Sequence, residues 1–93
     1  MHKVSGIKIT EVNLRENNLE KADLKRASFE RADLMGANLK EANLEEADLK
    51  EANLEMANLE GSNLTKANLR GAYPPRAQIR GAKLINAHME ELN

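Results

Sequence analysis

The chain has 93 residues and is close to neutral, with 14 basic and 15 acidic side chains and a net charge of −1 at pH 7. This balance is neither that of a basic nucleic-acid-binding protein nor that of a strongly acidic one. The absence of cysteine excludes disulfide bonds and thiolate metal ligands. Because there is no apolar stretch of roughly 18 residues, and residues 1–6 lack the apolar run of a signal peptide, we expect a cytoplasmic protein with no membrane or nucleic-acid partner.

Five-residue units follow one another without interruption from residue 7 to residue 91, between short tails at residues 1–6 and 92–93. The central residue of each unit, position i, is leucine in most units, and the series begins at Ile9 and ends at Met89. Position i−2 is usually alanine, position i−1 is usually asparagine or aspartate, and positions i+1 and i+2 are mostly charged. A fixed period without insertions predicts one repeat domain over residues 7–91 with no internal boundary.

The five-residue period fits neither regular secondary structure. Five steps of an α-helix turn the chain by about 500°, so successive leucines would spread around the helix axis. In a flat strand, an odd step would place successive leucines on opposite faces. The high content of Ala, Glu, Lys, Leu and Arg is typical of a coiled coil, but regularly spaced asparagines favour turns over helices. The leucines share one core if the backbone turns by about 90° in each unit and closes after four units.

Tandem Ala-(Asn/Asp)-Leu-x-x units, such as those of residues 37–41 and 42–46, resemble the pentapeptide-repeat family, and the match covers nearly the whole chain. The resemblance implies an all-β fold. This fold is a right-handed quadrilateral parallel β-helix, a pentapeptide-repeat solenoid in which each unit forms one side. Four units make one coil of about 20 residues, so residues 7–91 predict about four coils. Successive coils would rise by about 4.8 Å, the spacing of hydrogen-bonded strands.

Each position of the unit has an expected role in such a fold. The i and i−2 side chains fill the interior, where a narrow tube leaves room at i−2 for Ala or Ser. The Asn or Asp at i−1 can bond the backbone at a turn. Position i+2, which holds Gly36, Gly61, Gly71 and Gly81, is expected to require unusual backbone angles. Asn17 is an anomaly at an inward position, and we expect it to bond backbone groups in the first coil.

The outward charges are ordered in a way that supports a coil of 20 residues. Residues 20 apart would stack on one face, and opposite charges alternate in nearly every such column, with Lys50 beneath Arg70 as the exception. Opposite charges stacked in this way are mildly favourable. The alternating columns are Glu20–Lys40–Glu60–Arg80, Glu11–Arg31–Glu51, Arg26–Glu46–Lys66, Lys21–Glu41, Lys25–Glu45 and Glu30–Lys50.

The resemblance also brings in one known role, because some pentapeptide-repeat proteins inhibit DNA gyrase with a strongly acidic rod that imitates duplex DNA. Imitation of DNA needs uncompensated negative charge at high linear density, whereas the carboxylates of this chain alternate with Lys and Arg. The sequence therefore favours a non-catalytic structural scaffold or protein–protein interaction module. A DNA-mimicking inhibitor of a type II topoisomerase is the alternative.

Two surfaces are candidate contact sites for an unknown protein partner. On the face centred on Leu54, four apolar side chains should point outward. They are Met35, Met56, Tyr73 and Pro75. Such a patch can mark a partner site, although single exposed apolar residues are common. At the C-terminal end, Ile85, Met89 and Leu92 would form either a cap over the last coil or an end-to-end contact, so we expect a monomer or an end-to-end homodimer.

The sequence contains no candidate catalytic, cofactor-binding or metal-binding residues. His2 and His88 lie near opposite ends of the predicted rod and cannot share a metal ion. Ser5, Ser28 and Ser62 have no histidine and acid partners for a nucleophilic triad. A rod with a filled interior offers no cavity for a small ligand. We therefore expect no enzyme activity and no cofactor.

Overall fold

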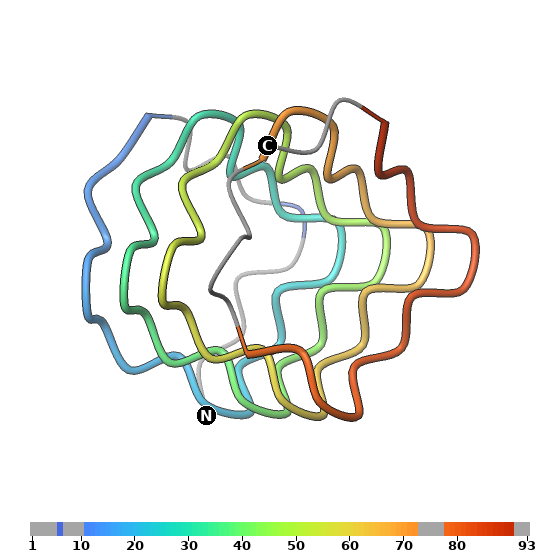
Figure 1. Ribbon diagram of the computed structural model, residues 1–93, viewed down its shortest axis with the longest axis horizontal. Helices are drawn as coiled ribbons and strands as arrows, with labels where there is room; N and C mark the ends of the chain where they lie inside the picture. The colour runs from blue at the N-terminus through green and yellow to red at the C-terminus, as the bar shows by residue number, and fades with distance from the viewer. Residues whose placement is uncertain (1–5, 7–10, 73–77, 91–93) are drawn as a thin grey trace.

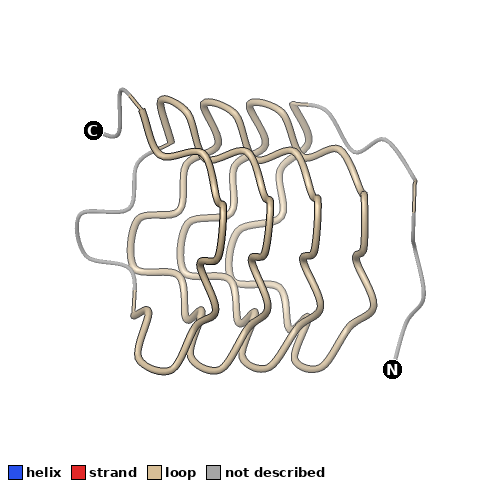
Figure 2. Ribbon diagram, turned by 90° about the vertical axis from the view of Figure 1, so that its right-hand side faces the viewer, coloured by secondary structure: helices blue, strands red, loops and turns tan. Residues whose placement is uncertain are grey.

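The computed structural model describes residue 6, residues 11–72 and residues 78–90, and within them the chain winds into a stack of four-sided coils (Figure 1, Figure 2). These described residues contain no helix and no strand of two or more paired residues. Instead, single-residue parallel bridges join position i−1 of one coil to position i−1 of the next, from the pair Asn13–Asp33 to the pair Asn68–His88. Each bridge links residues 20 apart, so the structure confirms the four-unit coil that the sequence predicts.

In most interior repeats every backbone N–H has an acceptor, as the unit of residues 42–46 illustrates. Three of its N–H groups donate to carbonyl oxygens of the neighbouring coils, one closes a turn within the coil, and one donates to a side chain. The bonds are Ala42 to Leu39 O (3.0 Å), Asn43 to Ala22 O (2.9 Å), Leu44 to Asn63 O (2.8 Å), Glu45 to Asn43 Oδ1 (3.1 Å) and Glu46 to Thr65 O (2.8 Å). Because a buried donor without a partner is costly, this complete pairing explains how single-residue bridges sustain a stable fold.

The asparagine or aspartate at i−1 bonds the backbone as the sequence predicts. In eleven repeats its Oδ1 accepts the N–H of residue i+1, two positions later, at 3.0–3.3 Å. This is the Asx-turn interaction, which a short polar side chain makes with its own backbone. It pairs the N–H that reaches neither the coil above nor the coil below.

Each corner of the coil places residue i+2 in the left-handed region. Its φ is 67–72° at the described glycines and 57–61° at eleven other residues. The next N–H donates back to the carbonyl of residue i, as in Ala57 to Leu54 O at 2.9 Å. A positive φ at the third residue of such a turn is the pattern of a type II turn. The unusual angles predicted from the glycines are confirmed, and they extend to residues for which left-handed backbone costs roughly 1–2 kcal/mol each.

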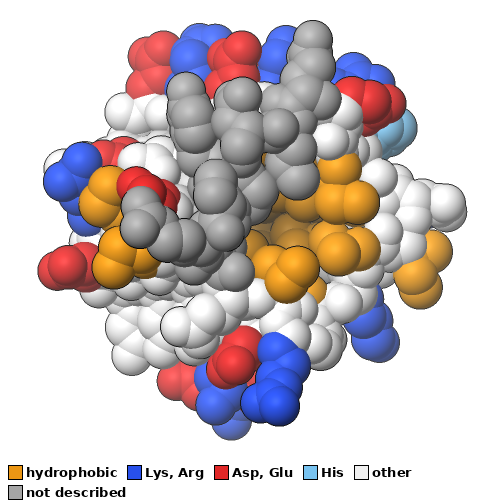
Figure 3. All heavy atoms as spheres, viewed as in Figure 1, with side chains coloured by type: hydrophobic (Ala, Val, Ile, Leu, Met, Phe, Trp, Pro, Cys, Tyr) orange, Lys and Arg blue, Asp and Glu red, His pale blue; other side chains and the backbone are white. Residues whose placement is uncertain are grey.

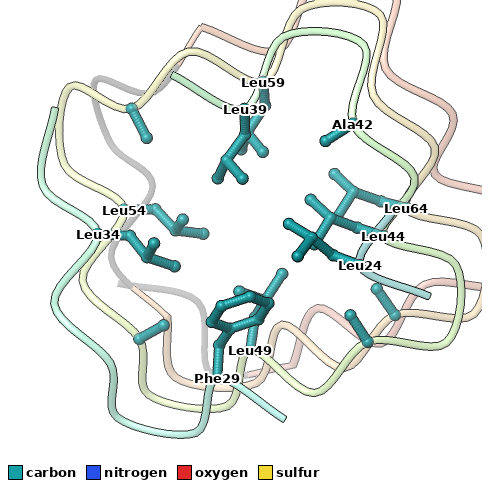
Figure 4. Close-up of a cluster of buried hydrophobic side chains, with 14 of the residues drawn as sticks. Leu24, Phe29, Leu34, Leu39, Ala42, Leu44, Leu49, Leu54, Leu59 and Leu64 are labelled. Carbon is teal, nitrogen blue, oxygen red and sulfur yellow. The ribbon is translucent and has the colours of Figure 1, made fainter. Parts of the chain in front are cut away.

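Columns of leucine fill the interior (Figure 4). Leu24, Leu44 and Leu64 lie one above another on one side of the coil, and each is at most 1% exposed. The inward alanines of these coils are equally buried. Ser62, which takes an alanine position, is also buried and donates its hydroxyl to Leu59 O at 2.8 Å. The structure therefore confirms that positions i and i−2 point inward and form one continuous apolar core.

Burial falls at both ends of the stack. Asn17 takes the regular i−2 backbone position but is exposed, because no described coil lies beneath it. Its Nδ2 donates to a backbone carbonyl, Arg15 O, at 3.4 Å, as predicted. At the other end, the His88 N–H donates to Ala67 O at 2.9 Å, so residues 87–90 continue the coil and do not fold across it as a cap. The predicted domain limits at residues 7 and 91 lie outside the described residues.

Candidate functional site

Met35 and Met56 lie at one corner of the stack, in neighbouring coils on the face centred on Leu54. Met35 takes position i+1 and is half-buried, whereas Met56 takes position i+2 and is 60% exposed. Turn geometry positions both residues: the Met35 N–H donates to Asp33 Oδ1 at 3.2 Å, and Met56 has a φ of 61°. The local turn therefore holds the Met56 side chain outward, away from the core.

Gly36 lies between Glu16 and Met56 in the same corner column. A Cβ added to Gly36 would lie 3.2 Å from Glu16 Cγ and 4.0 Å from Glu16 Oε2, with no other described side chain in reach. The residue directly beneath Met56 in this column therefore carries no side chain. Flexible, polarizable methionine suits contacts with irregular apolar surfaces.

The structure describes only some of the other predicted contact residues. Tyr73, Pro75 and Leu92 lie outside the described residues. Ile85 is 63% exposed and Met89 is 42% exposed, both on the last coil. Ile79 was not among the predicted surface residues; it takes an inward i position and is nevertheless 51% exposed. Its place in the final coil of the 20-residue count is the signal that could have identified it.

Surface ion pairs follow the 20-residue columns. Arg31 contacts three carboxylates: its Nε is 2.8 Å from Glu11 Oε2, and its Nη1 is 3.2 Å from Glu30 Oε2 and 3.7 Å from Glu51 Oε1. Other pairs between neighbouring coils are Lys21–Glu41 (3.8 Å), Lys25–Glu45 (3.8 Å), Arg26–Glu46 (3.6 Å), Arg70–Glu90 (3.4 Å) and Arg15–Asp33 (2.6 Å). Three of the predicted columns are therefore confirmed as ion pairs, and the column Arg26–Glu46–Lys66 is confirmed only between its first two members. Within the columns Glu20–Lys40–Glu60–Arg80 and Glu30–Lys50, the described residues form no ion pair with one another, and the last two pairs above were not predicted. All are at least partly exposed to solvent, so each contributes little to stability.

Three described ionisable groups have shifted pKa values. A hydrogen bond to Glu11 raises the pKa of Arg31. Burial disfavours the charged form of Asp33, but hydrogen bonds, first among them that from Arg15, outweigh burial and lower the pKa of this carboxyl. Its own backbone N–H and a neighbouring arginine lower the pKa of Glu90. All three shifts favour the charged form, which is the behaviour of ion pairs and not of a general acid or base near neutral pH.

In the parts of the chain that the structure describes, no three His, Asp or Glu side chains gather into a group that could hold a metal ion. No helix among these residues is long and apolar enough to cross a membrane. His88 is exposed on the last coil.

A family model described as pentapeptide repeats matches residues 7–45 and 42–73, with eight copies. The chain belongs to the pentapeptide repeat family. Solved pentapeptide repeat proteins are right-handed β-helices, so the fold class predicted from the sequence is confirmed. No curated protein has a significantly similar sequence.

Three solved structures illustrate the likeness. HetL of the cyanobacterium Nostoc, a pentapeptide repeat protein involved in regulating heterocyst differentiation, is 25% identical over 92% of this chain and 48% of its own, with a TM-score of 0.60. A pentapeptide repeat protein of the Arabidopsis thaliana thylakoid lumen is 33% identical over 92% of this chain and 63% of its own, with a TM-score of 0.53. QnrB1, a plasmid-mediated fluoroquinolone resistance protein, is 21% identical over 92% of this chain and 55% of its own, with a TM-score of 0.60, and shows the fold alone. The chain spans less than two thirds of the length of each of these proteins.

Proposed function

We propose that this pentapeptide repeat protein is a non-catalytic scaffold or protein–protein interaction module, located in the cytoplasm, that binds a protein partner through the Met35/Met56 corner. The observation that carries the proposal is the 60% exposure of Met56, which its left-handed turn holds outward on a mostly charged surface. Half-buried Met35 extends the apolar area in the coil below. Tyr73 and Pro75 belong to the same face by the repeat count and complete the proposed contact.

Two features support a role without catalysis. Leucine and alanine side chains fill the interior of the described coils, which leaves no enclosed space for a substrate. The described groups with shifted pKa values lie in exposed ion pairs that stay charged near neutral pH, so they are poor candidates for proton transfer.

Capture from an extract of the native host tests the corner. The bait is the tagged chain, compared with a Met35→Glu, Met56→Glu double variant and a Met35→Leu, Met56→Leu control that keeps the surface apolar. We expect the Glu variant to lose a captured protein by about tenfold or more, equivalent to about 1.4 kcal/mol, while the Leu variant retains it. Far-UV circular dichroism checks that all three are folded. Equal capture by all three baits would refute the proposed site.

Inhibition of a type II topoisomerase by DNA mimicry is the second candidate. Residues 41–60 favour it, because they carry seven acidic side chains and one basic side chain. Four of these carboxylates, however, pair with Lys or Arg one coil below, so their charge is compensated where a DNA mimic needs it free. We expect no inhibition of gyrase supercoiling at tens of micromolar protein. Dose-dependent inhibition would establish this function instead.

The oligomeric state is a further part of the proposal. A monomer and an end-to-end homodimer are both consistent with the exposed Ile85 and Met89. Light scattering over a range of protein concentrations distinguishes the two states, because the dimer dissociates on dilution.

A further inference from the structure

The last described coil, residues 78–90, carries two basic side chains, Arg80 and Lys83, and one acidic side chain, Glu90. Residues 61–89 contain no Asp or Glu and five Lys or Arg, in contrast to the acidic segment 41–60. Arg80 and Lys83 are exposed on this coil, and neither forms an ion pair with a described residue. Arg70, one coil below, pairs with Glu90 at 3.4 Å. The positive charge of Arg80 and Lys83 is therefore available to an anionic partner.

The same coil presents backbone donors without acceptors. In the coil below, the N–H groups at positions i and i+2 donate upward to carbonyls of residues 78–85 at 2.6–2.9 Å. The equivalent N–H groups of the last coil belong to Ile79, Gly81, Leu84 and Asn86, and none of them donates to a described residue. Such a row of free donors is an edge to which an extended segment can add.

The side chains that satisfy the turns elsewhere are also replaced in this coil. Its described i−1 positions hold Gln78, Lys83 and His88 where lower repeats have Asn or Asp. The N–H groups of Arg80 and Ile85 consequently lack the Asx acceptor found in eleven repeats, and no described side chain takes its place. At this end of the stack free donors outnumber free acceptors: Ala82 O and Ala87 O, which correspond to Ser62 O and Ala67 O one coil below, also have no described donor.

Apolar side chains accompany these donors. Ile79 is 51% exposed, Ile85 is 63% exposed and Met89 is 42% exposed. Figure 3 shows hydrophobic side chains reaching the surface around a hollow in the right-hand half of the view, the half toward which Figure 1 places the red C-terminal coil. Charged side chains lie along the upper and lower edges of the same view (Figure 3).

We infer that the last coil is a docking edge for an extended acidic peptide segment of a partner protein. The peptide carbonyls accept the free N–H groups, its carboxylates pair with Arg80 and Lys83, and its apolar side chains cover Ile79 and Met89. Strand addition supplies affinity through main-chain hydrogen bonds, and the basic side chains select an acidic partner. A second copy of the chain fits this edge less well, because joining two such ends brings like charges together. The inference rests on the proposed protein-binding function and names the chemistry of a partner at a second surface.

Fluorescence anisotropy with a labelled peptide tests the edge. The probe has the sequence of residues 41–60, which is acidic and keeps the repeat pattern, and the control peptide replaces each Glu by Gln and the Asp by Asn. We expect Arg80→Glu to weaken binding of the acidic probe about tenfold or more, and Arg80→Ala to weaken it less. Lys40→Glu is the matched control, because Lys40 occupies the same exposed column two coils lower without an ion pair to a described residue. Circular dichroism confirms that each variant is folded.

Amide hydrogen exchange locates the bound peptide. We expect the acidic probe to slow exchange at Ile79, Gly81, Leu84 and Asn86. No binding of the acidic probe, equal binding of the neutral peptide, or an equal loss in Lys40→Glu would overturn the inference. Binding of phosphatidylserine vesicles or of duplex DNA in place of the peptide would do the same, as would self-association through this end. The proposed function can survive the failure of this edge. It would stand if the acidic peptide did not bind here while capture of a host protein still depended on Met56.

Discussion

Replacing Leu44 by alanine tests whether the leucine columns carry the stability of the coils. Leu44 is fully buried between Leu24 and Leu64 (Figure 4). Removing its three outer carbons forfeits about 2.4 kcal/mol of transfer free energy, at about 0.8 kcal/mol for each buried CH₂. The coils above and below limit collapse around the cavity, so we expect a total loss of about 3–4 kcal/mol, within the range seen for buried leucines. For a small domain this is a large part of the whole free energy of unfolding.

Leu84 is the matched control, because it lies in the same column in the last described coil, where it is only partly buried. Its side chain already meets water, so Leu84→Ala should cost about 1 kcal/mol. Urea denaturation followed by far-UV circular dichroism measures both losses, and we expect an unchanged m-value. Equal losses in the two variants would refute the argument and would indicate that the last coil is covered in solution.

Three smaller perturbations test the turns and the surface. Gly81→Ala should lower the free energy of unfolding by roughly 1–2 kcal/mol because the φ of Gly81 is 72°. The new Cβ would not clash, since the nearest non-neighbouring backbone atom lies 3.7 Å away. An unchanged melting temperature would show that the corner tolerates a side chain. Asn43→Ala should lower the free energy of unfolding by about 1 kcal/mol, because the Glu45 N–H loses its acceptor. Asn43→Asp keeps an Oδ1 and should lower it less in the same denaturation experiment. A larger loss for the Asp variant than for the Ala variant would contradict the Asx role. The lowered pKa of Asp33 adds stability that is fully present above about pH 4 and is lost as the pH falls through the lower folded-state value. Asp33→Asn should therefore flatten the acid end of the stability profile, and an identical acid profile for the variant would count against the ion pair.

The coil was predictable because the sequence displays two periods that report different interactions. Leucine and alanine recur every five residues because each unit buries one side, and charges alternate every 20 residues because neighbouring coils touch. The outward position of Met56 follows from the same count. The exposure of Asn17 could not be predicted from its own unit, because burial at an inward position depends on a coil beneath it. Arg15 and Asp33 are 18 residues apart, so their contact depends on side-chain reach and not on the column.

The sequence predicts only some of the left-handed corners. Glycine at position i+2 indicates a positive φ, but the residue types of Glu46 and Lys66 do not indicate that they adopt the same angle. A turn that every unit repeats imposes this angle whatever residue the position holds, because the inter-coil hydrogen bonds fix the path of the chain. Tertiary pairing therefore overrides local preference at eleven described corners.

The proposed docking edge has two physical components, and Lys83 allows them to be separated. Lys83→Gln removes the positive charge and leaves the Ile85 N–H free. Lys83→Asn removes the same charge and also restores an Oδ1 that can accept this N–H, as Asn63 does for Thr65 at 3.1 Å one coil below. If free donors contribute to the edge, the Asn variant should bind the acidic peptide more weakly than the Gln variant, by about threefold or more for a hydrogen bond worth roughly 1 kcal/mol. Equal affinities would assign the selectivity to charge alone and would remove the Ile85 N–H from the docking edge.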